Sequence, residues 1–412
     1  MNVNNQHIPS GYKPSPLGII PEDWEVKRLG ELGDFSKGNG VPKDKIIKDK
    51  HGHPCLTYGD LYTKYDFVIK DIKSFIENDI ASGSKEIHNG DICFAGSGET
   101  PEDIGKCAAY IEERTAFAGG DIIILSPNKG INSIWLSYVL NSDIGRKQRY
   151  KSAQGFSIVH IYPDNLKRIQ IPTPTLKEQR RIVSVLSLWD TAIAKQTALI
   201  EKLTLRKRGL MQQLLTGKKR LKGFEGGTFH RIGNYISECN NRNTGCKRVL
   251  SVTNTRGFIL QEEQFDKIVA SNDTSNYKVV RRGEFAYNPS RVNVGSLAML
   301  NEYDEGILSP MYIVFKANEN IDKTYLLQCL QSWWFRGHIP AYTQGSVRDS
   351  LSFDGLCSMK FYIPALQEQK AISAILEQSD KEIETQKQKL AAMQAQKKGL
   401  MQVLLTGKKR IK

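Results

Sequence analysis

The chain of 412 residues is 40% hydrophobic and 25% charged, which is the composition of a folded globular protein and excludes general disorder. Its formal net charge of +14 favours a polyanionic partner, most often nucleic acid, over a merely soluble surface. The seven cysteines include no Cys-x-x-Cys pair and no apolar run approaches the roughly 18 residues of a membrane helix, so we expect a cytoplasmic protein with reduced thiols and no membrane contact.

The first half of the chain reads as one mixed unit. Residues 1–20 hold several prolines and predict a loose lead-in, and Trp24 begins the folded part. Short strands, such as Asp91–Phe94 and Asp121–Leu125, alternate with Gly-rich turns. A helix is expected from Ile134 to about Tyr150, followed by a polar loop that contains Gly155.

A long helix should follow this unit. Pro172 and Pro174 are expected to close the unit, because proline continues neither a strand ladder nor a helix. From Leu176 the apolar positions alternate in steps of four and three, which predicts a heptad seam and a helix of roughly 60 Å that stops at Gly217. The apolar positions expected to pair with a second helix are Ile182, Leu186, Trp189, Ile193, Ile200, Leu203, Leu210 and Leu214.

The same plan occurs twice. Residues 207–222 return as residues 397–412 with thirteen of sixteen positions identical, at an offset of 190. The second seam consists of Ile372, Leu376, Ile383, Leu390, Met393, Leu400 and Leu404. Both seams are interrupted by Gln and Lys at equivalent places (Gln196 and Gln386, Lys207 and Lys397), which favours pairing of the two helices with each other.

This repeat predicts an α+β fold. Two mixed α/β domains, related by a pseudo-two-fold, should be separated by an antiparallel coiled coil of two long helices. The expected boundaries are 1–165 for the first domain, 166–222 for the first helical region, 223–355 for the second domain and 356–412 for the second helical region.

The residues give little support for catalysis. Phe94-Ala-Gly-Ser-Gly98 follows a strand and is similar to the Gly-rich loop that binds S-adenosylmethionine, so a stand-alone adenine DNA methyltransferase is an alternative. Such an enzyme also needs an Asp/Asn-Pro-Pro-aromatic motif, and Asn288-Pro-Ser290 lacks the second proline and the aromatic residue. His51-Gly-His-Pro-Cys55 has no clear fourth metal ligand. We therefore predict no catalytic residue, no metal site and no cofactor on this chain.

Polar loops of the two mixed domains carry the residue types that read base edges in DNA. Arginine suits guanine, Asn and Gln suit adenine, and Ser or Thr suits either. The alternative is that these loops are plain surface turns. The candidates for DNA contact are Ser97, Glu99, Thr100, Lys106, Gln154, Ser157, Asn288, Ser290, Arg291, Asn293, Gln344, Ser346 and Arg348.

The two helix ends are strongly basic. Residues 202–222 and 385–412 contain no Asp or Glu. Two interpretations remain open. The cations either complement the helix dipole on a solvated face, or they face phosphates or an acidic partner.

Taken together, these residues resemble the specificity subunits of type I restriction-modification systems. The resemblance rests on Gly18-Ile-Ile-Pro-Glu-Asp-Trp-Glu-Val-Lys-Arg-Leu-Gly30, on both Pro-x-Leu-x-Glu-Gln helix openings and on both Gly-Leu-Met-Gln-x-Leu-Leu-Thr-Gly-Lys-Lys-Arg endings. The segments 90–100 and 285–295 are also similar to that family's recognition domains.

The resemblance implies a non-catalytic subunit that recognises DNA. Each mixed domain would be a target recognition domain for one half of a split, asymmetric sequence in double-stranded DNA. The paired helices would set the spacing and dock two modification subunits, which bind S-adenosylmethionine and methylate adenine. Restriction subunits with motor and nuclease activity would join for cleavage, and ATP and Mg²⁺ would be bound by partner subunits. A coiled-coil adaptor without DNA contact is a third hypothesis.

Overall fold

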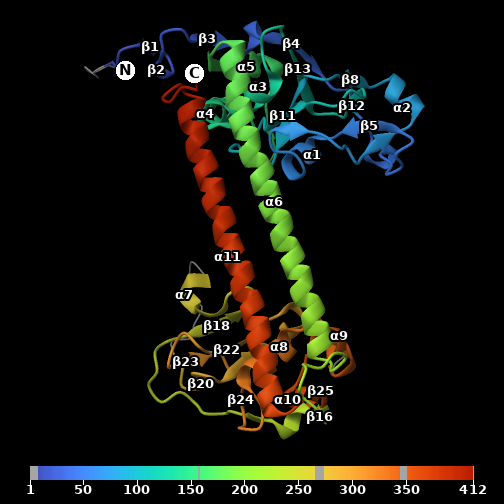
Figure 1. The fold of residues 1–412 in the computed structure, drawn as a ribbon, viewed down its shortest axis with the longest axis vertical. Coiled ribbons are helices and arrows are strands. Elements are labelled where there is room, and N and C mark those ends of the chain that lie inside the picture. The colour runs from blue at the N-terminus through green and yellow to red at the C-terminus, as the bar shows by residue number, and fades with distance from the viewer. Residues whose placement is uncertain (1–7, 156–157, 265–272, 344–349, 412) are drawn as a thin grey trace. The chain divides into compact units, whose positions relative to one another are not determined.

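The structure is a computed structural model that describes residues 8–155, 158–264, 273–343 and 350–411. The chain divides into two compact units (Figure 1). Unit 1 comprises Met1–Lys195 and Leu390–Lys412, and unit 2 comprises Gln196–Lys389. Each unit therefore contains one mixed domain and a segment of each of the two long helices, α6 (Leu176–Leu214) and α11 (Leu366–Leu404).

The mixed domain of unit 1 is built from short strands and helices. Its strands are β1 (Tyr12–Ser15), β2 (Gly18–Pro21), β3 (Glu25–Arg28), β4 (Gly33–Lys37), β5 (His53–Leu56), β6 (Val68–Ile69), β7 (Phe75–Ile76), β8 (Lys85–Ile87), β9 (Ile92–Ala95), β10 (Ser97–Gly98), β11 (Cys107–Tyr110), β12 (Ala116–Ala118), β13 (Ile122–Pro127), β14 (Val159–His160) and β15 (Gln170–Thr173). Its helices are α1 (Tyr58–Thr63), α2 (Asn78–Ser82), α3 (Ser133–Asn141), α4 (Asp143–Lys151) and α5 (Pro163–Lys167).

The mixed domain of unit 2 uses the same kinds of element. Its strands are β16 (Thr228–Arg231), β17 (Ile236–Glu238), β18 (Leu250–Thr253), β19 (Gly257–Leu260), β20 (Lys278–Arg281), β21 (Phe285–Tyr287), β22 (Leu297–Met299), β23 (Glu305–Leu308), β24 (Ile313–Ala317) and β25 (Lys360–Ile363). Its helices are α7 (Gln261–Gln264), α8 (Lys323–Gln331), α9 (Trp333–His338) and α10 (Phe353–Ser358), and 3₁₀ turns include η4 (Val292–Val294).

The central sheets of the two domains have the same strand order. In unit 1 the order is β4-β13-β9-β11, with β6 added parallel to β11, and in unit 2 it is β17-β24-β21-β22. Hydrophobic side chains from these strands and from α3 or α8 form the main core of each unit, which includes the end of one long helix. Leu404 is buried in unit 1 and Leu214 in unit 2, so the repeated leucines anchor each helix end in a domain core.

The long helices run antiparallel within each unit. In unit 2, Gln196 bonds Gln386 and Lys207 pairs with Asp380, so residue numbers rise along α6 as they fall along α11. In unit 1 the same order holds for Glu178 with Arg410, just after α11, and for Asp190 with Lys397. The predicted seam positions are buried at Ile182, Leu186, Leu203, Leu214, Ile372, Leu376, Ile383 and Leu404. They are half-buried at Trp189, Ile193, Ile200, Leu210, Leu390, Met393 and Leu400.

The fold class is as predicted, with two mixed domains and a long helix between them in the chain, but three local expectations are wrong. Residues 12–21 form the hairpin β1–β2 rather than a loose lead-in. The helix expected from Ile134 to Tyr150 breaks at Ser142, whose extended backbone starts a second helix. Pro172 lies within β15 opposite Val26, which its missing N–H permits because β15 pairs on one side only.

The long helices are amphipathic rather than apolar. Among the described residues, no helix has the length and hydropathy needed to cross a membrane.

Candidate DNA interface

The two domains present a loop on the same hydrogen-bonded frame. In unit 1 the loop spans residues 96–105 (loop 1), and in unit 2 it spans residues 289–295 (loop 2). The Ala95 N–H donates to the Lys106 carbonyl at 2.9 Å, and the equivalent bond joins Asn288 to Ser296 at 3.1 Å. A second pair of bonds, Ile161 N–H to Gly96 O and Leu351 N–H to Pro289 O, fixes the start of each loop at 3.0 and 3.1 Å. The two domains therefore share a frame but carry different side chains on it.

In loop 1 the predicted residues differ in accessibility. Ser97 is buried, and its hydroxyl lies 2.9 Å from His160 Nδ1, so this side chain supports the loop. Glu99 and Thr100 are exposed at the tip. Lys106 is half-buried, with its Nζ 3.5 Å from the Asp66 carboxylate.

The glycines of loop 1 have packing roles. A Cβ on Gly98 would stand 2.7 Å from the Tyr62 hydroxyl, and one on Gly96 would stand 2.9 Å from the Asp121 carbonyl oxygen. The whole segment Phe94–Gly98 is buried. Its similarity to a cofactor-binding loop therefore has a structural explanation, since small residues are needed for close packing here.

A third predicted reading segment lies beside loop 1. Gln154 is exposed, and its backbone exchanges two hydrogen bonds with His160, at 3.0 and 2.7 Å. Residue Ser157 lies outside the described residues, as do Gln344, Ser346 and Arg348 of the equivalent segment in unit 2.

Loop 2 exposes most of its predicted residues. Ser290, Arg291 and Asn293 are exposed. Asn288 is 8% exposed, accepts the Ser290 N–H at 3.0 Å and lies 3.8 Å from the Met311 sulfur, so it holds the loop rather than offering a free amide. The base-contact role of all these side chains stays a prediction.

Two exposed neighbours of loop 2 escaped the prediction from sequence. Asn254 comes from the turn between β18 and β19, and Arg336 comes from α9. Val294, inside the loop, is exposed as well. A Cβ added to Gly295 would lie 3.3 Å from Arg336 Nη2 and 3.4 Å from Asn254 Cβ, so both side chains approach this glycine closely. Only the Asn254 turn had a local signal, a polar run ending in Gly257. The approach of Arg336 depends on tertiary packing.

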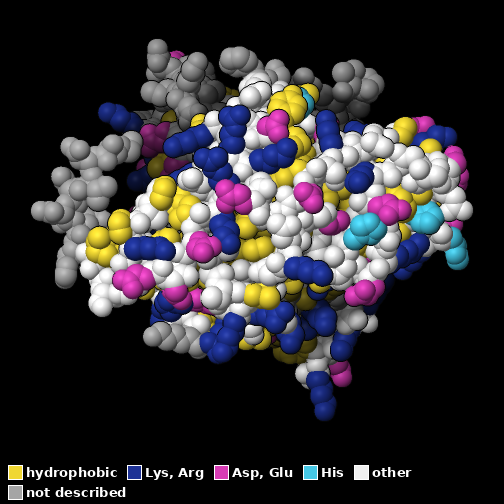
Figure 2. All heavy atoms as spheres, turned by 90° about the horizontal axis from the view of Figure 1, so that it is seen from above, with side chains coloured by type: hydrophobic (Ala, Val, Ile, Leu, Met, Phe, Trp, Pro, Cys, Tyr) yellow, Lys and Arg dark blue, Asp and Glu magenta, His cyan; other side chains and the backbone are white. Residues whose placement is uncertain are grey.

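Positive and negative side chains are mixed on the face of the molecule that Figure 2 shows. Lys218, Lys219, Lys408 and Lys409 are exposed at the helix ends. The arginine that follows each lysine pair, Arg220 or Arg410, forms an ion pair within the protein. Arg220 forms two bonds with the Glu368 carboxylate, at 2.9 and 2.5 Å, and Arg410 does the same with Glu178, at 2.8 and 2.7 Å.

These arginine pairs repeat at the offset of 190 and join each helix end to the start of the other long helix. Glu178 and Glu368 are buried, so each carboxylate depends on its arginine. In unit 1, Arg410 also bonds Asp23 and holds the pKa of that carboxyl below its usual range. Hydrogen bonding to Glu178 raises the pKa of Arg410.

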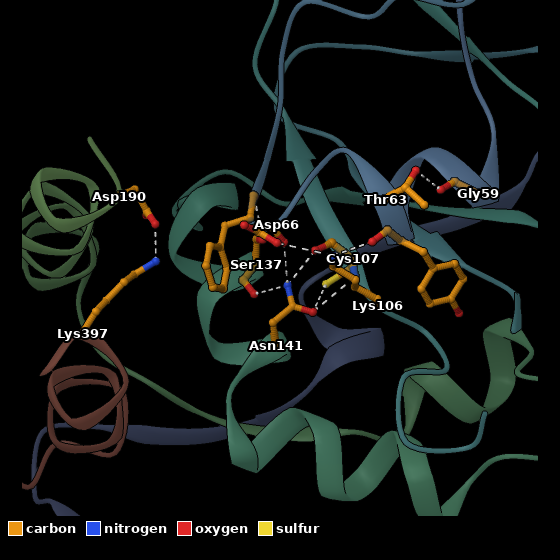
Figure 3. Close-up of polar contacts among 11 residues, drawn as sticks. Gly59, Thr63, Asp66, Lys106, Cys107, Ser137, Asn141, Asp190 and Lys397 are labelled. Carbon is orange, nitrogen blue, oxygen red and sulfur yellow. Dashed lines mark hydrogen bonds and ion pairs between the residues drawn. The ribbon is translucent and has the colours of Figure 1, made fainter. Parts of the chain in front are cut away.

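A hollow of about 370 Å³ lies in unit 1, where the mixed domain meets α6 and α11 (Figure 3). Lys397 is almost fully buried at its wall, paired with Asp190, and its Nζ lies 4.1 Å from the Phe67 ring centroid. Asn141 bonds the carbonyls of Cys107 and Ser137, which fixes the neighbouring wall. The carboxylates of the lining each have a cation within 4 Å: Asp66 with Lys106, Asp143 with Arg146 and Asp190 with Lys397.

Metal ligands do not gather in the part of the chain that the structure describes, where no group of three or more His, Cys, Asp or Glu side chains is placed to hold an ion.

Comparison with known proteins agrees with this geometry. The sequence model described as "Type I restriction modification DNA specificity domain" matches residues 21–205 and 253–394, which together exceed half of the chain. The chain belongs to this family. It is a specificity subunit, and hence a non-catalytic component of a type I restriction-modification system.

Relatives of this specificity subunit match along nearly the whole chain. The putative type I restriction enzyme MjaX specificity subunit of Methanocaldococcus jannaschii is 29% identical and aligned over 97% of each chain. The MjaVIII specificity subunit of the same organism is 25% identical, over 95% of this chain and 94% of that protein.

Solved structures share the fold at lower identity. The S subunit from M. genitalium has a TM-score of 0.55 at 15% identity, covering 93% of this chain and 96% of that one. A chain from a study of complex assembly and conformational transition of the type I R-M system has a TM-score of 0.59 at 17% identity, covering 94% and 99%.

Proposed function

We propose that this specificity subunit reads a bipartite, asymmetric target in double-stranded DNA, one half with each mixed domain. The observation that carries the proposal is the shared frame of loops 1 and 2 with different side chains on it. A common frame presents both loops in the same way, and different side chains select different bases.

The helical part would serve as the assembly frame. The paired α6 and α11 segments would dock two modification subunits, with restriction subunits joining for cleavage. The repeated arginine–glutamate pairs and helix endings support two equivalent docking positions. S-adenosylmethionine, ATP and Mg²⁺ would be bound by those partners and not by this chain.

A domain exchange tests the division of labour. Residues 223–355 would be replaced by the corresponding domain of another family member, and the methylated adenines of the host genome would be mapped by single-molecule sequencing. We expect one half of the methylated motif to change while the other half stays the same. A change in both halves would contradict the modular reading.

A further inference from the structure

The tip of loop 2 exposes an aliphatic side chain among polar ones. Val294 is 58% exposed, although the other exposed side chains of loop 2, those of Ser290, Arg291 and Asn293, are all polar. The loop holds it rigidly. The Gly295 N–H bonds the Val292 carbonyl at 3.0 Å, and the Ser296 N–H bonds the Arg291 carbonyl at 3.1 Å. A rigid, exposed apolar group loses little conformational entropy when it is covered by a ligand.

Asn293 is restricted by the same loop. Its Oδ1 accepts the Val294 N–H at 2.9 Å, so the amide oxygen is engaged within the protein. The amide NH₂ remains as a pair of donors. An asparagine that reads adenine must donate to N7 and accept from N6 with the same amide plane, which would compete with the bond from the Val294 N–H that orients the Asn293 oxygen. A single bond donated by the NH₂ group keeps that internal bond and needs no second contact from the oxygen.

A hydrogen-bond donor beside an aliphatic group matches one base edge in the major groove. Thymine presents the O4 acceptor next to its C5 methyl group, whereas cytosine presents a donor, guanine two acceptors, and adenine an acceptor and a donor. We propose that Asn293 donates to O4 of a thymine and that Val294 covers the methyl group of the same base. The inference rests on the proposed function and names one base that the second domain reads.

The surroundings of the pair fit a DNA surface. Arg291 and Arg336 are both exposed near this tip, Arg291 within loop 2 and Arg336 with its Nη2 close to Gly295. Guanidinium groups that flank a base-reading pair can bond phosphates and so fix its register on the duplex. Asn254, from a separate turn, stands against the same glycine and offers a further polar contact.

Replacing thymine by uracil isolates the methyl contact. Once the target is known, the specificity subunit in complex with its modification subunits would be titrated with duplexes that carry deoxyuridine at one thymine at a time. Uracil keeps O4 and base pairing and loses only the methyl group. We expect affinity to fall about fourfold at a single position of the half-site read by the second domain, the effect of exposing one buried methyl-sized group. All measurements share one salt concentration, because phosphate contacts make affinity salt-dependent.

Variants of the loop assign that position to Val294. In Val294→Ala the uracil penalty should shrink to less than twofold, and in Val294→Ile it should persist. Asn293→Asp should weaken binding at least tenfold, because a carboxylate faces the O4 acceptor. The uracil penalties in the other half-site should be the same in all variants, which also shows that the variants are folded.

The outcomes separate the inference from the proposed function. A second-domain half-site without an A·T pair, or one whose thymines all tolerate uracil, overturns the thymine assignment. An equal uracil penalty in wild type and Val294→Ala overturns it as well. Failure of the wild-type complex to prefer its target over unrelated DNA would instead overturn the proposed function.

Discussion

The buried carboxylates of the helix openings make each unit dependent on a single arginine. Glu368 is fully buried and both of its oxygens accept from Arg220. Arg220→Ala leaves this carboxylate without its cationic partner, and we expect the urea concentration at the midpoint of unfolding to fall clearly. Urea denaturation of the purified protein measures the change. Lys219→Ala, at an exposed neighbour, should change the free energy of unfolding by no more than about 0.5 kcal/mol, and an equal effect of both variants would refute the role of Glu368.

The buried thiols predict an alkaline limit to stability. Burial raises the pKa of Cys107 and of Cys329 to about 12, from an ordinary value of 9.0. Below the pKa of the unfolded chain, about 9, these thiols keep their proton in both states and the fold keeps its full stability. As pH rises from about 9 towards 12, only the unfolded chain releases the protons, which favours unfolding. The urea concentration at the midpoint of unfolding should therefore be lower at pH 10 than at pH 8.

Alkylation measures the solvent accessibility of the same thiols. At pH 8.5, iodoacetamide followed by mass spectrometry should leave Cys107 and Cys329 unmodified in the native protein, whereas the half-buried Cys246 reacts. Native modification of Cys107 at the rate of Cys246 would show that this part of the core opens readily.

At the scale of elements, replacement by alanine should have opposite effects on stability at two glycines, Gly399 inside α11 and Gly407 just after its C-terminal end. Gly407 has φ +72°, and an added Cβ would lie 2.4 Å from Cδ of Pro21. Gly399 lies inside the helix, and its Cβ would meet nothing within 4 Å. We expect Gly407→Ala to destabilise the protein by more than about 1 kcal/mol and Gly399→Ala to stabilise it by up to about 1 kcal/mol. Thermal unfolding of the two variants checks the signs, and a stabilising Gly407→Ala would contradict the left-handed cap.

The same elements show which features were predictable. The long helices and their glycine ends follow from local periodicity and from left-handed backbone preferences, both of which a sequence displays directly. The break at Ser142 was missed because no proline marks it and the polar segment that follows, residues 143–151, is itself helical. The equivalent break at Ser332 has the same extended backbone, and there the serine hydroxyl caps the next helix.

The candidate interface was predictable only in part. Residue type pointed to Arg291 and Asn293, because their loop is polar and contains a turn. Burial separates these from Ser97 and Asn288, and burial is decided by long-range packing. The approach of Arg336 to Gly295 joins residues 41 positions apart and leaves no local pattern.

At the scale of the whole molecule, the repeat separates a constant frame from variable loops. The pairs Asp190–Lys397 and Lys207–Asp380 are equivalent at the offset of 190, as are Glu178–Arg410 and Glu368–Arg220. Gln196 bonds its own counterpart, Gln386, through the side-chain amides at 2.8 Å. Helix contacts are thus duplicated while the loops are not, which predicts that spacing and base choice can be altered independently.

Lengthening both helices by one heptad tests this independence. Repeating residues 197–203 after position 203 and residues 387–393 after position 393 preserves the seam and adds about 10 Å to each helix. Since one turn of DNA spans about 34–36 Å in 10–10.5 base pairs, we expect the spacer of the target to grow by about three base pairs.

Both half-sites should stay unchanged, because neither loop nor its frame is touched. Methylome mapping in a host that carries the variant measures spacer and half-sites together. The matched control adds two residues to each helix instead of seven, which rotates the apolar stripe by about 200° away from its partner and should abolish methylation. If the heptad variant still methylates targets with the original spacer, or methylates targets with a new half-site, the helices do not set the distance between the two half-sites.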